Sequence, residues 1–143
     1  MNIIAIFIAA ILFITALIHV GWGFGMLWPA TDEQTLIKTV IGSPNITTMP
    51  SLGLTLFVAA GIAGAGLCAL WGARVINLPL PEWMRLTSLV VLAVIFTVRG
   101  IMTYLPIGPL STSLEPFRTL DQTYFAPLIL VIAAGYISIL VSK

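Results

Sequence analysis

Apolar runs of membrane-spanning length fill most of this chain and limit what it can fold into. They lie at about residues 3–28, 52–71, 86–105 and 124–141. Because an α-helix rises ~1.5 Å per residue, about 20 apolar residues cross a hydrocarbon core of ~30 Å. Hydrophobic residues make up 59% of the chain and charged residues 8%, whereas about a quarter of a soluble domain is charged. The sequence predicts one all-α integral membrane domain over residues 1–143, a four-helix transmembrane bundle in a lipid bilayer.

Composition argues against several function classes. The formal net charge is +1 and no Lys/Arg cluster offers a basic surface to nucleic acid. Cys68 is the single cysteine, so neither an internal disulfide nor a Cys-x-x-Cys redox pair can form. His19 is the single histidine, and one imidazole without a nearby His or Cys does not predict a metal site. The chain carries no haem, flavin or nucleotide motif, and we expect no cofactor.

The connection after the first run has a helical pattern of its own. Residues 31–34 fit a capping box, with Thr31 as N-cap and Gln34 bonding back to it. Gly42 and Pro44 end the segment. Between them, apolar residues recur on one face: Leu36, Ile37, Val40 and Ile41. We expect a short amphipathic helix that lies on the membrane surface or covers the bundle end as a lid.

The second run is rich in small residues. Gly and Ala recur there at spacings of three and four, the pattern that lets membrane helices pack backbone to backbone. The residues are Ala59, Ala60, Gly61, Ala63, Gly64, Ala65 and Gly66. This pattern predicts a packing helix, either within the bundle or between copies of the chain in a homo-oligomer.

The distribution of charge predicts the orientation. The middle connection and the C-terminus hold three basic residues against one acid, namely Arg74, Arg85 and Lys143 against Glu82. The first and third connections hold two basic residues against four acids, namely Lys38 and Arg118 against Asp32, Glu33, Glu115 and Asp121. Basic residues accumulate on the cytoplasmic side, so we expect a multi-pass cell-membrane protein with both termini in the cytoplasm.

One charged side chain lies inside an apolar run. An Arg near the centre of a spanning helix costs roughly 2.5–3.5 kcal/mol on insertion scales, so Arg99 needs a partner. Asp121, at the outer start of the fourth run, is the natural counter-ion. The guanidinium has five N–H donors, and Thr103, Tyr104 and Tyr124 are candidates to accept some of them.

His19 and Trp22 lie at a matching depth in the first run. A buried single His is either a neutral imidazole bonded to a nearby carbonyl or hydroxyl, for instance of Thr15, or a proton carrier or ligand donor. The candidate ligand-binding residues are therefore His19, Trp22, Arg99, Tyr104, Asp121 and Tyr124. We assign no catalytic residue. A clasp between Arg99 and Asp121 that only holds two helices together is an equal alternative, and residues 119–122 also fit a capping box that would place Asp121 in a first helical turn.

Three motifs give the chain a resemblance to a known family. They are L-I-H-V-G-W-G-F-G in the first run, V-R-G-I-M-T-Y in the third, and F-R-T-L-D-Q-T-Y-F-A-P-L entering the fourth. Together they resemble a family of small four-span bacterial membrane proteins, which is catalogued as a domain of unknown function. The resemblance implies a four-helix membrane fold in a bacterial inner membrane and no particular activity. Other members carry a further acid near the position of Thr103, and its absence here argues against a two-carboxylate mechanism.

Three function classes follow from these residues. The first is a protein whose outward-facing polar pocket binds or transports a small amphipathic or lipid-like molecule. The second is a membrane enzyme that acts on an apolar isoprenoid- or sterol-like substrate, with His19 or Asp121 transferring protons and Trp22 facing a cationic intermediate. The third is a structural or assembly subunit without a ligand. The chain has no paired acid/base motif and no phosphate-binding motif, which favours the first class.

Overall fold

The computed structural model describes residues 2–142, and its regular structure is helical throughout this range. Four helices are long and apolar enough to cross a membrane: α1 (Asn2–Gly23), α3 (Leu52–Gly72), α4 (Glu82–Met102) and a continuous helix from Phe117 to Val141. The last of these comprises α5 (Phe117–Leu120), the π-helix η2 (Asp121–Phe125) and α6 (Ala126–Val141). The expected all-α fold with four spanning helices is confirmed.

Helix boundaries differ from those expected from the apolar runs. α1 ends at Gly23 rather than near residue 28, because Gly25 adopts a positive φ of 89° that leaves the right-handed helix. α4 begins at Glu82, directly after Pro81, and the last helix begins at Phe117, both within polar sequence. Backbone hydrogen bonds of a helix form with apolar and polar residues alike, so these two helices begin in the polar residues that precede their apolar runs.

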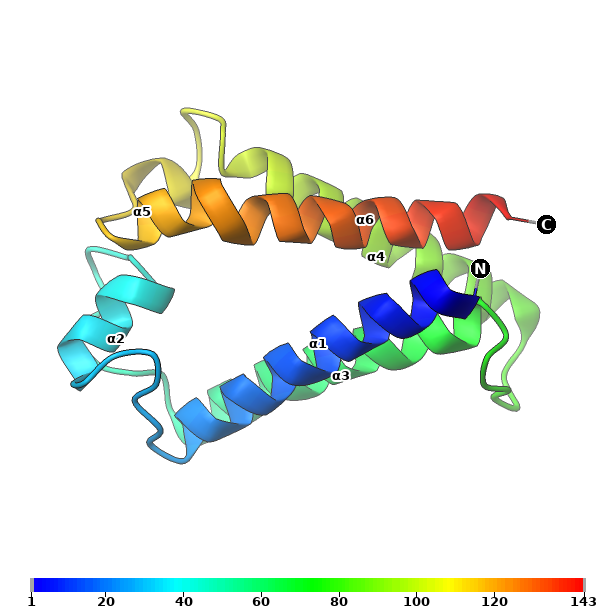
Figure 1. The fold of residues 1–143 in the computed structure, drawn as a ribbon, viewed down its shortest axis with the longest axis horizontal. Coiled ribbons are helices and arrows are strands. Elements are labelled where there is room, and N and C mark those ends of the chain that lie inside the picture. Colours follow the sequence, from blue (N-terminus) through cyan, green and yellow to red (C-terminus); the bar gives the residue numbers. More distant parts are fainter. Residues whose placement is uncertain (1, 143) are drawn as a thin grey trace.

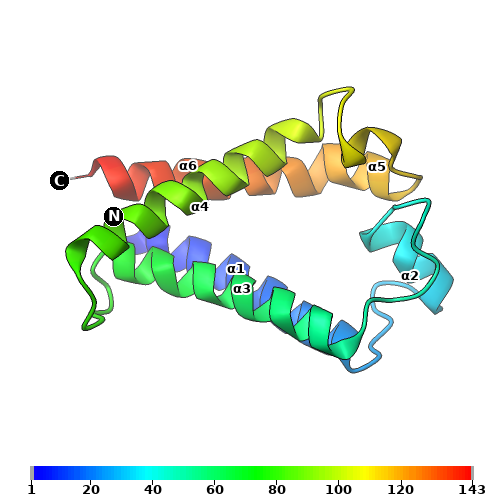
Figure 2. The ribbon, with the colours of Figure 1, turned by 180° about the vertical axis from the view of Figure 1, so that it is seen from behind.

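The long helices form two pairs. α1 packs along α3, and α4 packs along the Phe117–Val141 helix. The pairs meet at the end where both termini lie and diverge toward the end that holds α2 (Glu33–Val40) and α5, as both views show (Figures 1 and 2). The structure is therefore a bundle that is closed at one end and spread at the other.

A compact core holds the two pairs together at the end that carries the termini. The buried side chains there come from all four helices: Ala5, Ile8, Leu12, Ala65, Ala69, Ala73, Leu89, Ala93, Ile132, Tyr136 and Ile139. Tyr136 is fully buried, and its hydroxyl donates to the Ala65 carbonyl at 2.7 Å. Its ring stacks on Phe96 with centroids 5.6 Å apart. A buried hydroxyl without an acceptor would be costly, so this hydrogen bond fixes α6 against α3.

The small residues of α3 are divided between two faces. Ala59, Ala65 and Gly66 are buried, and a Cβ on Gly66 would lie 3.0 Å from the Phe13 ring of α1. These positions allow α1 and α3 to approach closely. Ala60 and Gly61 are exposed, so an interface between copies of the chain stays a prediction for that face.

Helix α2 has the expected amphipathic character, but its cap differs by one residue from the predicted capping box. Asp32, not Thr31, is the N-cap, and its Oδ1 accepts a hydrogen bond from the Thr35 amide at 2.9 Å. The Thr35 hydroxyl also donates to Oδ2 at 2.7 Å. A carboxylate that accepts both bonds is a stronger cap than a threonine hydroxyl, and these bonds lower the pKa of Asp32. Gln34 instead donates to the Thr47 carbonyl at 2.8 Å.

A contact between the first and third connections bridges the spread end. Gly42, which follows α2, has a positive φ of 64°, and a Cβ there would lie 2.5 Å from the buried Phe117 side chain. The Leu114 amide donates to the Gly42 carbonyl at 2.7 Å. Only glycine meets both conditions without strain. α2 is thereby held next to α5, across the gap between the two helix pairs (Figure 1).

Candidate functional site

The predicted ion pair between Arg99 and Asp121 is present and includes Thr103. Arg99 Nη2 lies 2.8 Å from Asp121 Oδ1, and Arg99 Nη1 donates to the Thr103 hydroxyl at 2.7 Å. That hydroxyl donates in turn to Asp121 Oδ2 at 2.8 Å. The Asp121 side chain is 2% exposed and that of Arg99 is 33% exposed. The network leaves both carboxylate oxygens satisfied, as a buried charge requires.

A π-helical turn carries Asp121. Over η2 the Ala126 amide donates to the Asp121 carbonyl, five residues back. Pro127 has no N–H to offer the Thr123 carbonyl, and the helix widens just before it. The predicted capping box at residues 119–122 is wrong, because the helix already begins at Phe117 and Asp121 follows α5 rather than lying in a first turn. π-turns of this kind are often found at functional sites.

The two tyrosines of the predicted site differ in their surroundings. The Tyr104 hydroxyl donates to the Gln122 carbonyl at 2.8 Å, so it joins α4 to the π-turn rather than accepting from Arg99. Tyr124 lies in the π-turn, and 63% of its surface is exposed. Tyr104 thus strengthens the contact between α4 and η2, while Tyr124 faces away from the buried network.

His19 and Trp22 form a separate group at the end of α1. His19 Nδ1 lies 2.8 Å from the Thr15 carbonyl oxygen. Because a carbonyl only accepts, Nδ1 carries the hydrogen. The imidazole and the Trp22 ring have centroids 4.9 Å apart and are inclined by 57°. Trp22 Nε1 donates to the Trp28 carbonyl at 2.7 Å. A bond to Thr15 is the structural alternative predicted for His19 from the sequence.

The predicted site residues therefore lie in two groups on different helix pairs. His19 and Trp22 belong to α1, whereas Arg99 belongs to α4, Tyr104 follows the end of α4, and Asp121 and Tyr124 belong to η2. The hydrogen bonds and ion pairs of residues 2–142 join residues within each group and none across them. Their role in ligand binding stays a prediction.

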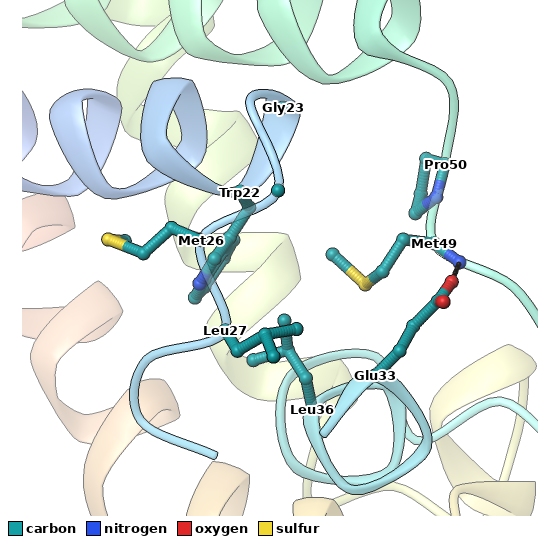
Figure 3. Close-up of a pocket in the computed structure, with 9 residues that line it drawn as sticks. Trp22, Gly23, Met26, Leu27, Glu33, Leu36, Met49 and Pro50 are labelled. Atoms are coloured by element: carbon teal, nitrogen blue, oxygen red, sulfur yellow. Dashed lines mark hydrogen bonds between the residues drawn. The ribbon is translucent and has the colours of Figure 1, made fainter. Parts of the chain in front are cut away.

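A cavity of about 280 Å³ lies beneath α2, where the end of α1 meets the segment that enters α3. Figure 3 shows Trp22 on one side of this space, with Met49 and Glu33 opposite. Most of the lining residues are apolar, but polar and apolar atoms share the surface of the cavity about equally: Trp22, Gly23, Gly25, Met26, Leu27, Glu33, Leu36, Met49 and Pro50. Glu33 Oε1 accepts a hydrogen bond from the Met49 amide at 2.8 Å. Trp22 is the residue that the cavity shares with the predicted site.

Sequence reasoning missed most of this lining, because seven of its nine members lie outside the spanning helices. Met26, Leu27, Met49 and Pro50 belong to connections, where single apolar residues carry no periodic signal. Glu33 reads as an ordinary first-turn acid of α2. The signal that was available is the amphipathic pattern of α2, whose buried Leu36 faces this cavity.

Four helices that are long and apolar enough to cross a membrane fit a multi-pass membrane protein. A family model described as "Protein of unknown function (DUF3995)" matches residues 12–136, and the chain belongs to this family. The matched segment contains both polar groups and the whole cavity lining. No curated protein and no solved structure matches the chain.

Proposed function

We propose that this membrane protein binds a small amphipathic or lipid-like molecule in the cavity beneath α2. The observation that carries the proposal is the cavity itself, whose walls combine an indole, the Met49 thioether and aliphatic side chains with one carboxylate. Ligand sites are typically apolar pockets with few polar groups that set orientation. About 280 Å³ is small for such a site, which favours a compact molecule or one end of a longer chain.

The Arg99 network has a different role in this proposal. Both oxygens of Asp121 are already bonded to Arg99 and Thr103, and its side chain is almost fully buried. A ligand would gain little from a carboxylate whose acceptors are occupied. The network therefore serves to hold α4 against η2 and to keep the second helix pair rigid while the first pair and α2 surround the ligand.

The proposal includes the orientation expected from charge, with both termini cytoplasmic and the cavity on the outer side. Exposed Trp28 and Trp83 lie near opposite ends of the spanning helices, where indoles are enriched at membrane interfaces. In a Cys68→Ala background, cysteines at Asn45 and Thr112, both exposed, should react with an impermeant maleimide in intact cells. A cysteine at Asn77 should react only after lysis. Reaction of Asn77→Cys alone in intact cells would place the cavity on the cytoplasmic side.

Ligand binding beside Trp22 is testable by fluorescence. A medium-chain alcohol with a terminal bromine should quench the purified protein with a saturable component, because bromine quenches an indole on contact. Trp22→Phe should remove that component. Trp83→Phe is the matched control, since Trp83 is 66% exposed at the other end of the molecule and does not line the cavity. Equal saturable quenching of wild type and Trp22→Phe would contradict binding in this cavity.

A further inference from the structure

Glu33 is the charged member of the cavity lining and narrows the ligand class. Among the residues that the structure describes, the lining contains this one carboxylate and no Lys, Arg or His. We infer that the ligand is an amphipathic cation, an alkylamine or quaternary ammonium compound, whose head pairs with Glu33 while its apolar part contacts Trp22 and Met49. This inference rests on the proposed function, because it names the ligand of the same cavity.

The position of Glu33 suits a counter-charge. It is the first residue of α2, and the bond from the Met49 amide to Oε1 holds its carboxylate on the cavity wall opposite Trp22 (Figure 3). That bond occupies one oxygen, and the hydrogen bonds described for this side chain leave Oε2 free to accept an ammonium N–H or to face a methylated ammonium head. The charge is thus fixed in place without being neutralised by a basic side chain.

The other walls also favour a cation. The face of an indole attracts an ammonium group within about 6 Å of its centroid, and Trp22 keeps its ring in place by donating to the Trp28 carbonyl. The sulfur atom of Met49, which points into the cavity, is polarizable and suits methylated or alkyl surfaces. Aromatic faces combined with a carboxylate are the usual means by which proteins recognise quaternary ammonium groups.

The charges near Glu33 also favour a cationic ligand over an anionic one. Asp32 precedes Glu33, and the hydrogen bonds from Thr35 lower the pKa of Asp32, so it is ionised at neutral pH. Lys38 is the basic residue of α2 and does not line the cavity. An anionic head group would therefore enter a region with two adjacent carboxylates, which disfavours fatty acids and sulfates. A neutral head such as a hydroxyl could donate one hydrogen bond to Glu33 but would lack the attraction between opposite charges.

The test uses three probes that share one brominated medium-length chain and differ in the head: trimethylammonium, hydroxyl or sulfate. Saturable quenching of Trp22 reports binding of each probe to the full-length protein in neutral detergent. The wild type should bind the ammonium probe roughly fivefold to tenfold more tightly than the hydroxyl probe, and the sulfate probe more weakly than either. This preference should decrease as salt is added, because the carboxylate is accessible to solvent.

Glu33→Gln separates charge from shape. The Gln Oε1 can still accept from the Met49 amide, so the fold around the cavity is retained while the charge is lost. We expect this variant to bind the ammonium probe as weakly as the hydroxyl probe, with hydroxyl binding unchanged. Asp32→Asn is the matched control, since it removes one charge next to Glu33 but outside the lining, and it should keep most of the preference.

Three outcomes would each overturn a different part of the account. Equal affinity of the wild type for all three probes, or an equal loss for all three in Glu33→Gln, would overturn the inference of a cationic ligand while leaving the cavity as a binding site. The absence of a saturable component that depends on Trp22 with every probe would overturn the proposed function itself. Tighter binding of the sulfate probe would reverse the ligand class.

Discussion

Replacing either Arg99 or Asp121 by Leu should lower the free energy of unfolding by about 3 kcal/mol, because each change leaves its partner charge unpaired in a largely desolvated position. We take the low end of the range for buried pairs because the Arg99 side chain is one-third exposed. Asp121→Leu should have the larger effect, since it strands a guanidinium at membrane depth. The double variant should recover much of the loss, because it leaves no charge unpaired.

Unfolding in detergent, followed by circular dichroism, measures this cycle. Arg74→Leu is the control, because Arg74 is ion-paired with Glu82 at 3.1 Å but its side chain is 68% exposed, and Glu82 keeps Arg85 as a second partner. An exposed ion pair contributes little, so this variant should remain close to the wild type. Additive losses for Arg99→Leu and Asp121→Leu would show that the two residues do not stabilise the protein as partners.

Much of the fold was predictable because membrane-spanning helices can be recognised from the length and hydropathy of their sequences. The four spanning helices follow from long apolar runs, and the Arg99–Asp121 pair follows from the cost of a lone charge inside one of them. Asp121 could be predicted as the partner of Arg99 because the expected orientation of the helices places both residues in the same half of the membrane. The hydrogen bond from His19 to the Thr15 carbonyl was also predictable, because the two residues are one helical turn apart in the sequence.

The remainder depends on tertiary placement that no local pattern encodes. The divergence of the helix pairs separates His19 and Trp22 from the Arg99 network, although all of these residues share one half of the membrane in the predicted topology. The cavity forms between the end of α1, helix α2 and the segment that enters α3. The position of α2 depends on tertiary contacts such as that of Gly42 with Phe117. The N-cap of α2 is Asp32 rather than the predicted Thr31, because the amide and the hydroxyl of Thr35 both donate to the Asp32 carboxylate.

Filling the cavity should weaken ligand binding by at least roughly tenfold, with little effect on the stability of the protein. Met49 is half-buried on the cavity wall and points into the space, so the larger ring of Met49→Trp should occupy it. A filled site excludes its ligand, and we expect at least a roughly tenfold loss of affinity, which corresponds to about 1.4 kcal/mol. Ile46→Trp is the matched control, since Ile46 lies in the same connection, is 38% exposed and does not line the cavity.

Mass spectrometry of the molecules that co-purify in mild detergent tests ligand binding beneath α2 most directly. The wild type and Ile46→Trp should retain the same bound amphipathic species at similar occupancy, and Met49→Trp should lose it while its melting temperature stays within a few degrees of the wild type. The same bound species at the same occupancy in a well-folded Met49→Trp protein would contradict a ligand site in this cavity.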